Sequence, residues 1–71
     1  MADERYPYTQ FGNRVRELRK AKGWSQEELA ESAGLDRTYI GRCEAGRQNA
    51  TLKTVYALAN ALGVKATDLL A

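Results

Sequence analysis

The amino-acid sequence predicts an all-α fold of four or five short helices. Apolar residues recur at intervals of three and four residues through most of the chain, which is the spacing of a buried helix face. Glycines stand between these segments, at positions where left-handed caps end helices: Gly23, Gly34, Gly46 and Gly63. The one proline, Pro7, lies in the N-terminal tail, and no segment reads as a pair of strands.

The first helix is predicted to begin near Thr9 or Gln10 and to end at Gly23. Its apolar face consists of Phe11, Val15 and Leu18. Ser25 and Glu28 then form the pattern of a capping box, in which each side chain bonds the other's backbone amide, so a second helix is expected from there to Gly34. Its inward residues are Leu29, Ala30 and Ala33.

Asp36 is predicted to cap the third helix, which turns Ile40 and Cys43 inward and ends at Gly46. Thr51 is predicted to cap the fourth helix, which ends at Gly63. Its wide apolar stripe must be buried, and consists of Leu52, Val55, Tyr56, Leu58, Ala59 and Leu62. Residues 66–70 can form a last short helix, with a loose start because Lys65 is a poor cap.

Composition excludes several classes of function. With no histidine and one cysteine among 71 residues, the chain cannot form a Cys/His zinc site, a histidine-based triad or an internal disulfide. Glu27, Glu28 and Glu31 are interpreted as helix-dipole partners, not as a catalytic pair, so no enzyme, metal or cofactor is expected. Without a secretory signal or membrane span, we expect a cytoplasmic protein, with a flexible tail over residues 1–9 and one domain over residues 10–71.

The net charge of +2 is unevenly distributed along the chain. Residues 14–22 hold five basic side chains and one acidic one, residues 26–31 hold only acidic ones, and residues 37–53 are again mostly basic. Such blocks can give a molecule one basic face although its total charge is small.

Residues 26–46 have the geometry of a helix-turn-helix, with a helix of seven to eight residues, a turn centred on Gly34 and a helix of about nine residues. This spacing alone also fits a helical hairpin of any bundle. The run from Gly23 to Val64, however, resembles the DNA-binding domain of the XRE, or Cro-repressor-like, helix-turn-helix family. Within that family it is most similar to the small controller proteins of restriction–modification systems, mainly through residues 34–40, Gly-Leu-Asp-Arg-Thr-Tyr-Ile.

The resemblance covers residues 11–70 and implies a lambda-repressor-like bundle. It implies a sequence-specific transcriptional regulator that binds double-stranded DNA. In so short a chain we expect no separate sensing domain and no small-molecule ligand. The alternative function is an antitoxin or adaptor whose main partner is another protein.

The resemblance further implies that residues 37–45 enter the major groove. Arg37 is expected to bind guanine O6 and N7, although it can also be solvated or paired with Asp36. Thr38 can contact a base or simply suit the first turn, and Arg42 is a base or phosphate contact. The expected phosphate contacts are Gln26, Tyr39, Arg47 and Asn49, and Arg14 and Arg16 can flank the DNA backbone as well. For Gln26, Arg14 and Arg16 the alternative is a solvated polar side chain.

Three residues are expected to have a structural role and no contact with DNA. Arg19 and Glu44 match positions that form a partly buried ion pair in the family, and Cys43 is expected to be buried and inert. Two residues depart from the pattern of the family and have no assigned role. Gly41 lies inside the third helix, and Ala50 stands where proline is often seen in the family. Gly41 can permit close approach of DNA or of a neighbouring helix.

A homodimer is expected, because one small domain reads only half of a pseudo-palindromic operator whose half-sites lie ~34 Å apart. The candidate interface residues are Tyr56, Leu62, Val64, Leu69 and Leu70. Alternatively, these residues close the core of a monomer.

Overall fold

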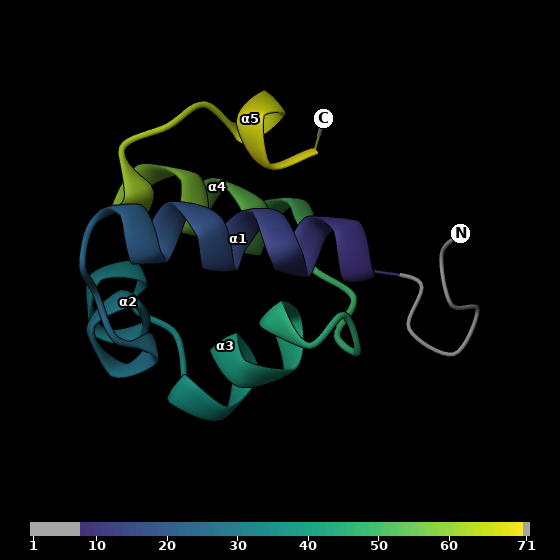
Figure 1. Ribbon diagram of the computed structural model, residues 1–71. Coiled ribbons are helices and arrows are strands. Elements are labelled where there is room, and N and C mark those ends of the chain that lie inside the picture. Colours follow the sequence, from purple (N-terminus) through teal and green to yellow (C-terminus); the bar gives the residue numbers. More distant parts are fainter. Residues whose placement is uncertain (1–7, 71) are drawn as a thin grey trace.

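The computed structural model describes residues 8–70, which form five helices and no strand, as the sequence predicts. The helices are α1 (Thr9–Ala21), α2 (Gln26–Ala33), α3 (Arg37–Glu44), α4 (Leu52–Leu62) and α5 (Ala66–Leu70). Helix α1 crosses the middle of the molecule beside α4; α2 and α3 lie on one side of α1 and α5 on the other (Figure 1).

The helix ends follow local capping chemistry. Ser25 and Glu28 form the predicted capping box, with Ser25 Oγ 3.1 Å from the Glu28 amide and Glu28 Oε1 2.9 Å from the Ser25 amide. The Asp36 carboxylate accepts from the Thr38 amide at 2.7 Å, which fixes the start of α3. At α5, the expected loose start is partly compensated, because Asp68 Oδ2 accepts from the Lys65 amide at 3.0 Å.

Each helix contributes at least one fully buried side chain to a single core. The largest of these are Val15, Leu29, Ile40, Leu58 and Leu69. Cys43 is also fully buried beside Ile40 on the inward face of α3, and Leu35 packs partly buried in the turn before it. One face of α3 therefore packs in the core, and the opposite face is exposed to solvent.

Gly12 allows α1 and α3 to approach closely. A Cβ atom at this position would overlap the Cys43 carbonyl oxygen and lie 2.8 Å from the Glu44 carbonyl oxygen. Gly12 was not predicted to have a role, although a glycine inside a helix costs ~1 kcal/mol relative to alanine and usually has a packing reason.

The folded domain includes part of the segment that was expected to be a flexible tail. Of residues 1–9, residues 1–7 lie outside the described part of the chain. Thr9 is the first residue of α1, and the Tyr8 amide donates to the Gly46 carbonyl at 3.3 Å. None of the helices in the described residues is long and apolar enough to cross a membrane.

Candidate nucleic-acid interface

The exposed face of α3 collects the three residues predicted to contact bases. Ile40, Cys43 and Glu44 are buried, so the helical period turns Arg37, Thr38 and Arg42 outward, where all three are exposed. Arg37 and Thr38 lie in the first turn and Arg42 lies one turn later. The three side chains can therefore reach one ligand surface together.

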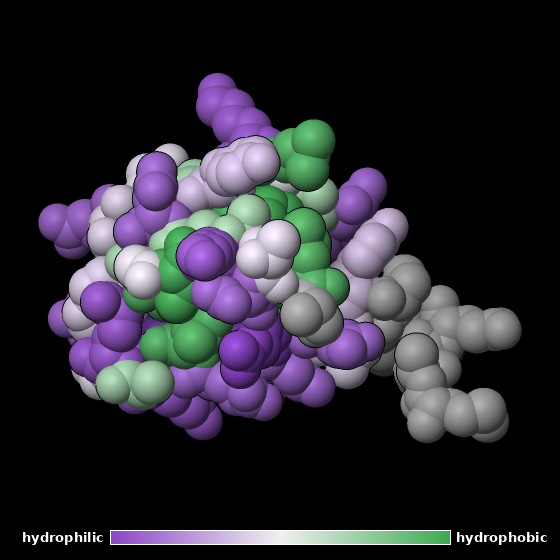
Figure 2. Space-filling view, turned by 90° about the horizontal axis from the view of Figure 1, so that it is seen from above, coloured by the Kyte–Doolittle hydropathy of each residue, from purple (hydrophilic) through white to green (hydrophobic). Residues whose placement is uncertain are grey.

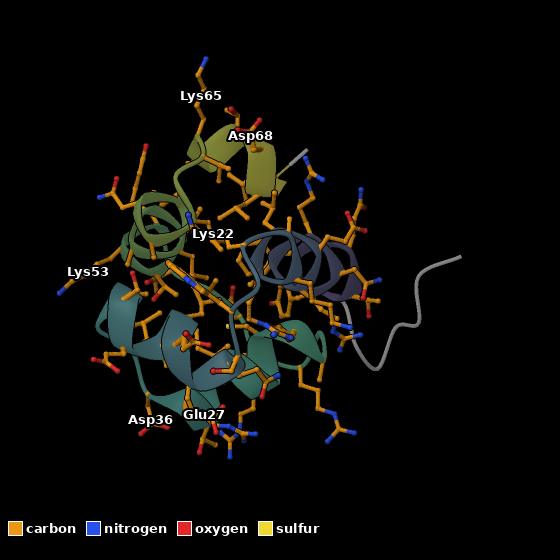
Figure 3. All side chains as sticks on the ribbon, turned by 60° about the vertical axis from the view of Figure 1, so that its left-hand side comes forward. Lys22, Glu27, Asp36, Lys53, Lys65 and Asp68 are labelled. Carbon is orange, nitrogen blue, oxygen red and sulfur yellow. The ribbon has the colours of Figure 1, made fainter. Side chains whose placement is uncertain are left out.

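Arg37 forms an ion pair with Glu27 of α2 and not with Asp36. Its Nε lies 3.8 Å from Oε1 of Glu27, and both side chains are exposed. Asp36, the partner considered from the sequence, uses its carboxylate as the cap of α3. Glu27 and Asp36 lie at the edge formed by α2 and α3, while Lys65 and Asp68 lie at the opposite edge with α5 (Figure 3).

A buried charge network behind α3 joins three helices. The Glu44 carboxylate accepts from Arg19 Nε at 2.6 Å, from Arg19 Nη2 at 3.0 Å and from Gln26 Nε2 at 3.1 Å. Arg16 approaches the same carboxylate at 3.6 Å, and Arg19 Nη1 also donates to the Trp24 carbonyl at 2.7 Å. The orientation of α3 is thereby tied to α1 and to the start of α2.

The network keeps both buried groups ionised. Burial raises the pKa of Glu44, but the hydrogen bonds from Arg19 and Gln26 and the charges of Arg19 and Arg16 outweigh it, so the pKa lies below its ordinary 4.5. The hydrogen bond to Glu44 raises the pKa of Arg19 above its ordinary value, against the lowering effect of burial. Glu44 is therefore an anion and Arg19 a cation at neutral pH.

Gln26, predicted to bind phosphate, stands where α2 begins beside α3. Its half-buried side chain is oriented by the bond to Glu44. A Cβ atom at Gly41 would lie 3.8 Å from Gln26 Oε1, which is ordinary contact distance. Packing within the chain therefore does not require glycine at position 41.

Tyr39 and the loop that follows α3 form the other end of the surface. The half-buried Tyr39 donates its hydroxyl to the Asn49 carbonyl at 3.3 Å. Arg47 and Asn49 are exposed in the same loop, and the Arg47 amide donates to the Arg42 carbonyl at 3.0 Å. Three of the predicted phosphate contacts are thus brought to one end of α3.

Arg14 lies apart from this surface. Its Nε donates to the Asp68 carbonyl of α5 at 2.9 Å, and its Nη1 lies 3.4 Å from Glu17. Arg16 is instead the α1 arginine beside α3, with Nη2 3.4 Å from the Glu44 carbonyl. Residues two apart on a helix lie ~200° apart around its axis, so Arg14 and Arg16 face opposite sides.

The buried thiol next to Tyr39 is not a reactive site. Burial raises the pKa of Cys43 to about 11 and outweighs the lowering effect of the hydrogen bond with Tyr39, while the charge of Glu44 adds the smallest contribution, also upward. Among residues 8–70, no cluster of three or more Cys, Asp and Glu side chains is arranged to hold a metal ion.

The residues suggested for a dimer interface divide into two groups. Leu62 and Leu69 are buried in the core of one chain, which corrects their assignment, because side chains enclosed by their own helices leave no surface for a partner. Val64 is half-buried against the same core, whereas Tyr56 and Leu70 are exposed. Leu52, not suggested for the interface, is also exposed, one turn before Tyr56 on α4. The prediction that the whole apolar stripe of α4 is buried is therefore wrong at Leu52 and Tyr56, because only the face with Val55, Leu58, Ala59 and Leu62 packs into the core.

Apolar surface also surrounds the end of α5. A hollow of about 210 Å³ lies there, lined by Tyr8, Phe11, Asn49, Ala50, Val55 and Leu70. Seen from the α5 side, apolar side chains gather across the middle of the molecule (Figure 2). The polar face of α3 and this apolar region therefore occupy different parts of the surface.

Comparisons with known proteins agree with this geometry. The helix-turn-helix family model matches residues 15–69. A hypothetical transcription factor of Neisseria meningitidis is 52% identical over 56 residues, which cover 79% of this chain and 53% of that protein, so the chain spans about half of that relative's length.

Solved structures are similar over most of their length. The restriction–modification controller protein C.AhdI of Aeromonas hydrophila is 48% identical, with a TM-score of 0.86 over 87% of this chain and 94% of that one. SinR, a master regulator for biofilm formation solved in complex with DNA, is 34% identical, with a TM-score of 0.83 over 86% of this chain and 98% of that one.

Proposed function

Because the chain belongs to the helix-turn-helix family, we propose that it is a transcriptional regulator that binds DNA in a sequence-specific manner. One observation carries the proposal: Arg37, Thr38 and Arg42 are exposed together on α3, in a fold that SinR presents to DNA. In this arrangement α3 enters the major groove, Arg37 binds guanine O6 and N7, and Thr38 and Arg42 contact neighbouring bases.

Phosphate contacts on either side hold α3 in the groove. Gln26 supplies one contact from the start of α2, where free backbone amides and the helix dipole favour a phosphate oxygen. Tyr39, Arg47 and Asn49 supply the second from the end of α3 and its following loop. These contacts determine position and affinity, whereas the bases determine sequence preference. Arg14 is left out of this set because it lies against α5.

The regulator acts as a homodimer on a pseudo-palindromic operator. A single domain of 7.9 kDa presents one α3, and two copies related by a two-fold axis read half-sites ~34 Å apart. Leu52, Tyr56 and Leu70 are the exposed large apolar side chains of the described residues and supply the contact between copies. The similarity to C.AhdI supports a controller of a restriction–modification system. Such a regulator acts in the cytoplasm.

The proposal is tested by selecting duplexes from a random-sequence library with the purified protein. We expect an inverted repeat to be enriched, and its affinity to fall steeply as salt rises, because bound phosphates release counterions. Sedimentation of the selected complex should show two chains per duplex. A library without enrichment, or binding without dependence on salt, would contradict the proposal.

A further inference from the structure

Glu27 places a carboxylate beside the arginine that is proposed to read a base. Its Oε1 lies 3.8 Å from Arg37 Nε, so the contact joins the first turn of α2 to the first residue of α3. The side chains are 71% and 56% exposed, so the pair stands on the surface near the proposed DNA contacts. Figure 3 shows Glu27 at the same edge of the molecule as Asp36, the first residue before α3.

The caps of α2 and α3 are supplied by acidic residues other than Glu27. Glu28 completes the capping box of α2 with Ser25, and Asp36 caps α3. Glu27 has neither task, although as an acid in the first turn of α2 it interacts favourably with the helix dipole. A carboxylate at a surface that meets phosphates weakens binding by repulsion. Its contact with Arg37 is the one feature of Glu27 that bears on the proposed base contact.

The atoms in contact suggest what the pair does. The closest approach to Glu27 is through Nε, at ion-pair distance, so the two terminal nitrogens of the guanidinium can still be offered to guanine O6 and N7. A long arginine side chain loses rotamer freedom when it binds a base, and a carboxylate that already restricts it reduces that loss.

We propose that Glu27 is a positioning residue that orients Arg37 and strengthens its preference for guanine. The proposal rests on the base-contact role proposed above for Arg37. Glu27 does not touch the base itself, and the preference it adds is obtained at the expense of affinity for DNA in general.

The chain provides a matched control for this proposal. Glu17 on α1 is 68% exposed and pairs with Arg14 at 3.4 Å, close to the exposure and spacing of the Glu27–Arg37 pair. Arg14 lies against α5, away from α3. Glu17→Gln and Glu27→Gln therefore remove the same charge from equally exposed pairs, and only the second pair contains the proposed reading arginine.

The experiment uses a duplex that the wild-type protein selects from a random-sequence library. Three further duplexes carry the other base pairs at the position whose preference Arg37→Ala relaxes. Dissociation constants are measured for all four duplexes. Both glutamate variants should bind random-sequence DNA more tightly, because each removes a negative charge. Only Glu27→Gln should also lower the preference for guanine, by about two- to fivefold, which is the range of an exposed ion pair. In an Arg37→Ala background it should have no such effect.

The outcomes separate this inference from the proposed function. Equal guanine preference in Glu27→Gln and Glu17→Gln would overturn the positioning role while leaving the role of Arg37 intact. If Arg37→Ala relaxes no base pair, the base-contact role fails and the positioning role fails with it. Circular dichroism of each variant checks that the fold is unchanged.

Discussion

Arg19 binds Glu44 through two nitrogens, at 2.6 and 3.0 Å, and this contact joins the last turn of α1 to the last residue of α3. The Glu44 side chain is 1% exposed and the Arg19 side chain 11%, so the pair is shielded from water. It lies directly behind the face that carries Arg37, Thr38 and Arg42. The position of that face therefore depends on a charge pair that is almost fully buried.

Removal of one partner should destabilise the domain strongly. Glu44→Ala leaves Arg19 buried without its carboxylate, and we expect a loss of ~3–5 kcal/mol in the free energy of unfolding. Glu17→Ala, which breaks an exposed pair with Arg14, should cost less than about 1 kcal/mol. Urea denaturation compares the two variants. Similar losses of stability in the two variants would show that the buried pair contributes no more than the exposed pair. The double variant Arg19→Met, Glu44→Leu should lose less stability than Glu44→Ala, because no unpaired buried charge remains.

The same pair makes stability depend on pH. Because the pKa of Glu44 is lower in the folded than in the unfolded chain, its contribution is fully present above the ordinary pKa of 4.5 and is lost as pH falls through the folded value. Thermal melts between neutral and strongly acidic pH should show a steeper loss below about 4.5 for the wild type than for Glu44→Gln. Parallel curves for the two proteins would contradict the lowered pKa.

The two glycines inside helices should respond oppositely to alanine. At Gly12 a Cβ would overlap the backbone of α3, so Gly12→Ala should destabilise the domain by ~1–3 kcal/mol or more. At Gly41 the nearest atom would be Gln26 Oε1 at 3.8 Å, so Gly41→Ala should stabilise it by up to ~1 kcal/mol through helix propensity. Denaturation midpoints measure both. A stabilised Gly12→Ala would show that α1 and α3 do not meet as described.

Cys43 should be unreactive in the folded protein. Its thiol is fully buried and its pKa is raised to about 11, so little thiolate exists at pH 8 and none is accessible. A thiol-specific colorimetric reagent should label the native chain slowly and the denatured chain rapidly. Rapid labelling of the native chain would mean that the inner face of α3 opens.

The helix boundaries could be predicted from the sequence because capping is local. Ser25 with Glu28, Asp36 and Thr51 each bond an amide two or three residues away, so their spacing alone locates the helix starts. The family resemblance is confirmed by the match over residues 15–69, which extends through several separate segments.

Other features depend on how the helices pack, which the sequence does not state. An apolar stripe shows that Leu62 must be buried, but not whether its own chain or a second copy buries it. The basic run in α1 does not tell which arginine lies beside α3 until α3 and α5 are placed on opposite sides of that helix. The Glu27–Arg37 pair likewise joins the first turns of α2 and α3, so it depends on how these two helices pack.

The central claim is that α3 reads bases and the loop after it holds phosphates, and one comparison tests it most directly. Base preference and affinity are measured for wild type, Arg37→Ala and Arg47→Ala on a selected duplex and its single-base variants. We predict that Arg37→Ala relaxes preference at one base pair by about 1–3 kcal/mol, and that Arg47→Ala weakens all duplexes alike and lowers the salt dependence. Equal, sequence-independent losses from both variants would contradict the claim.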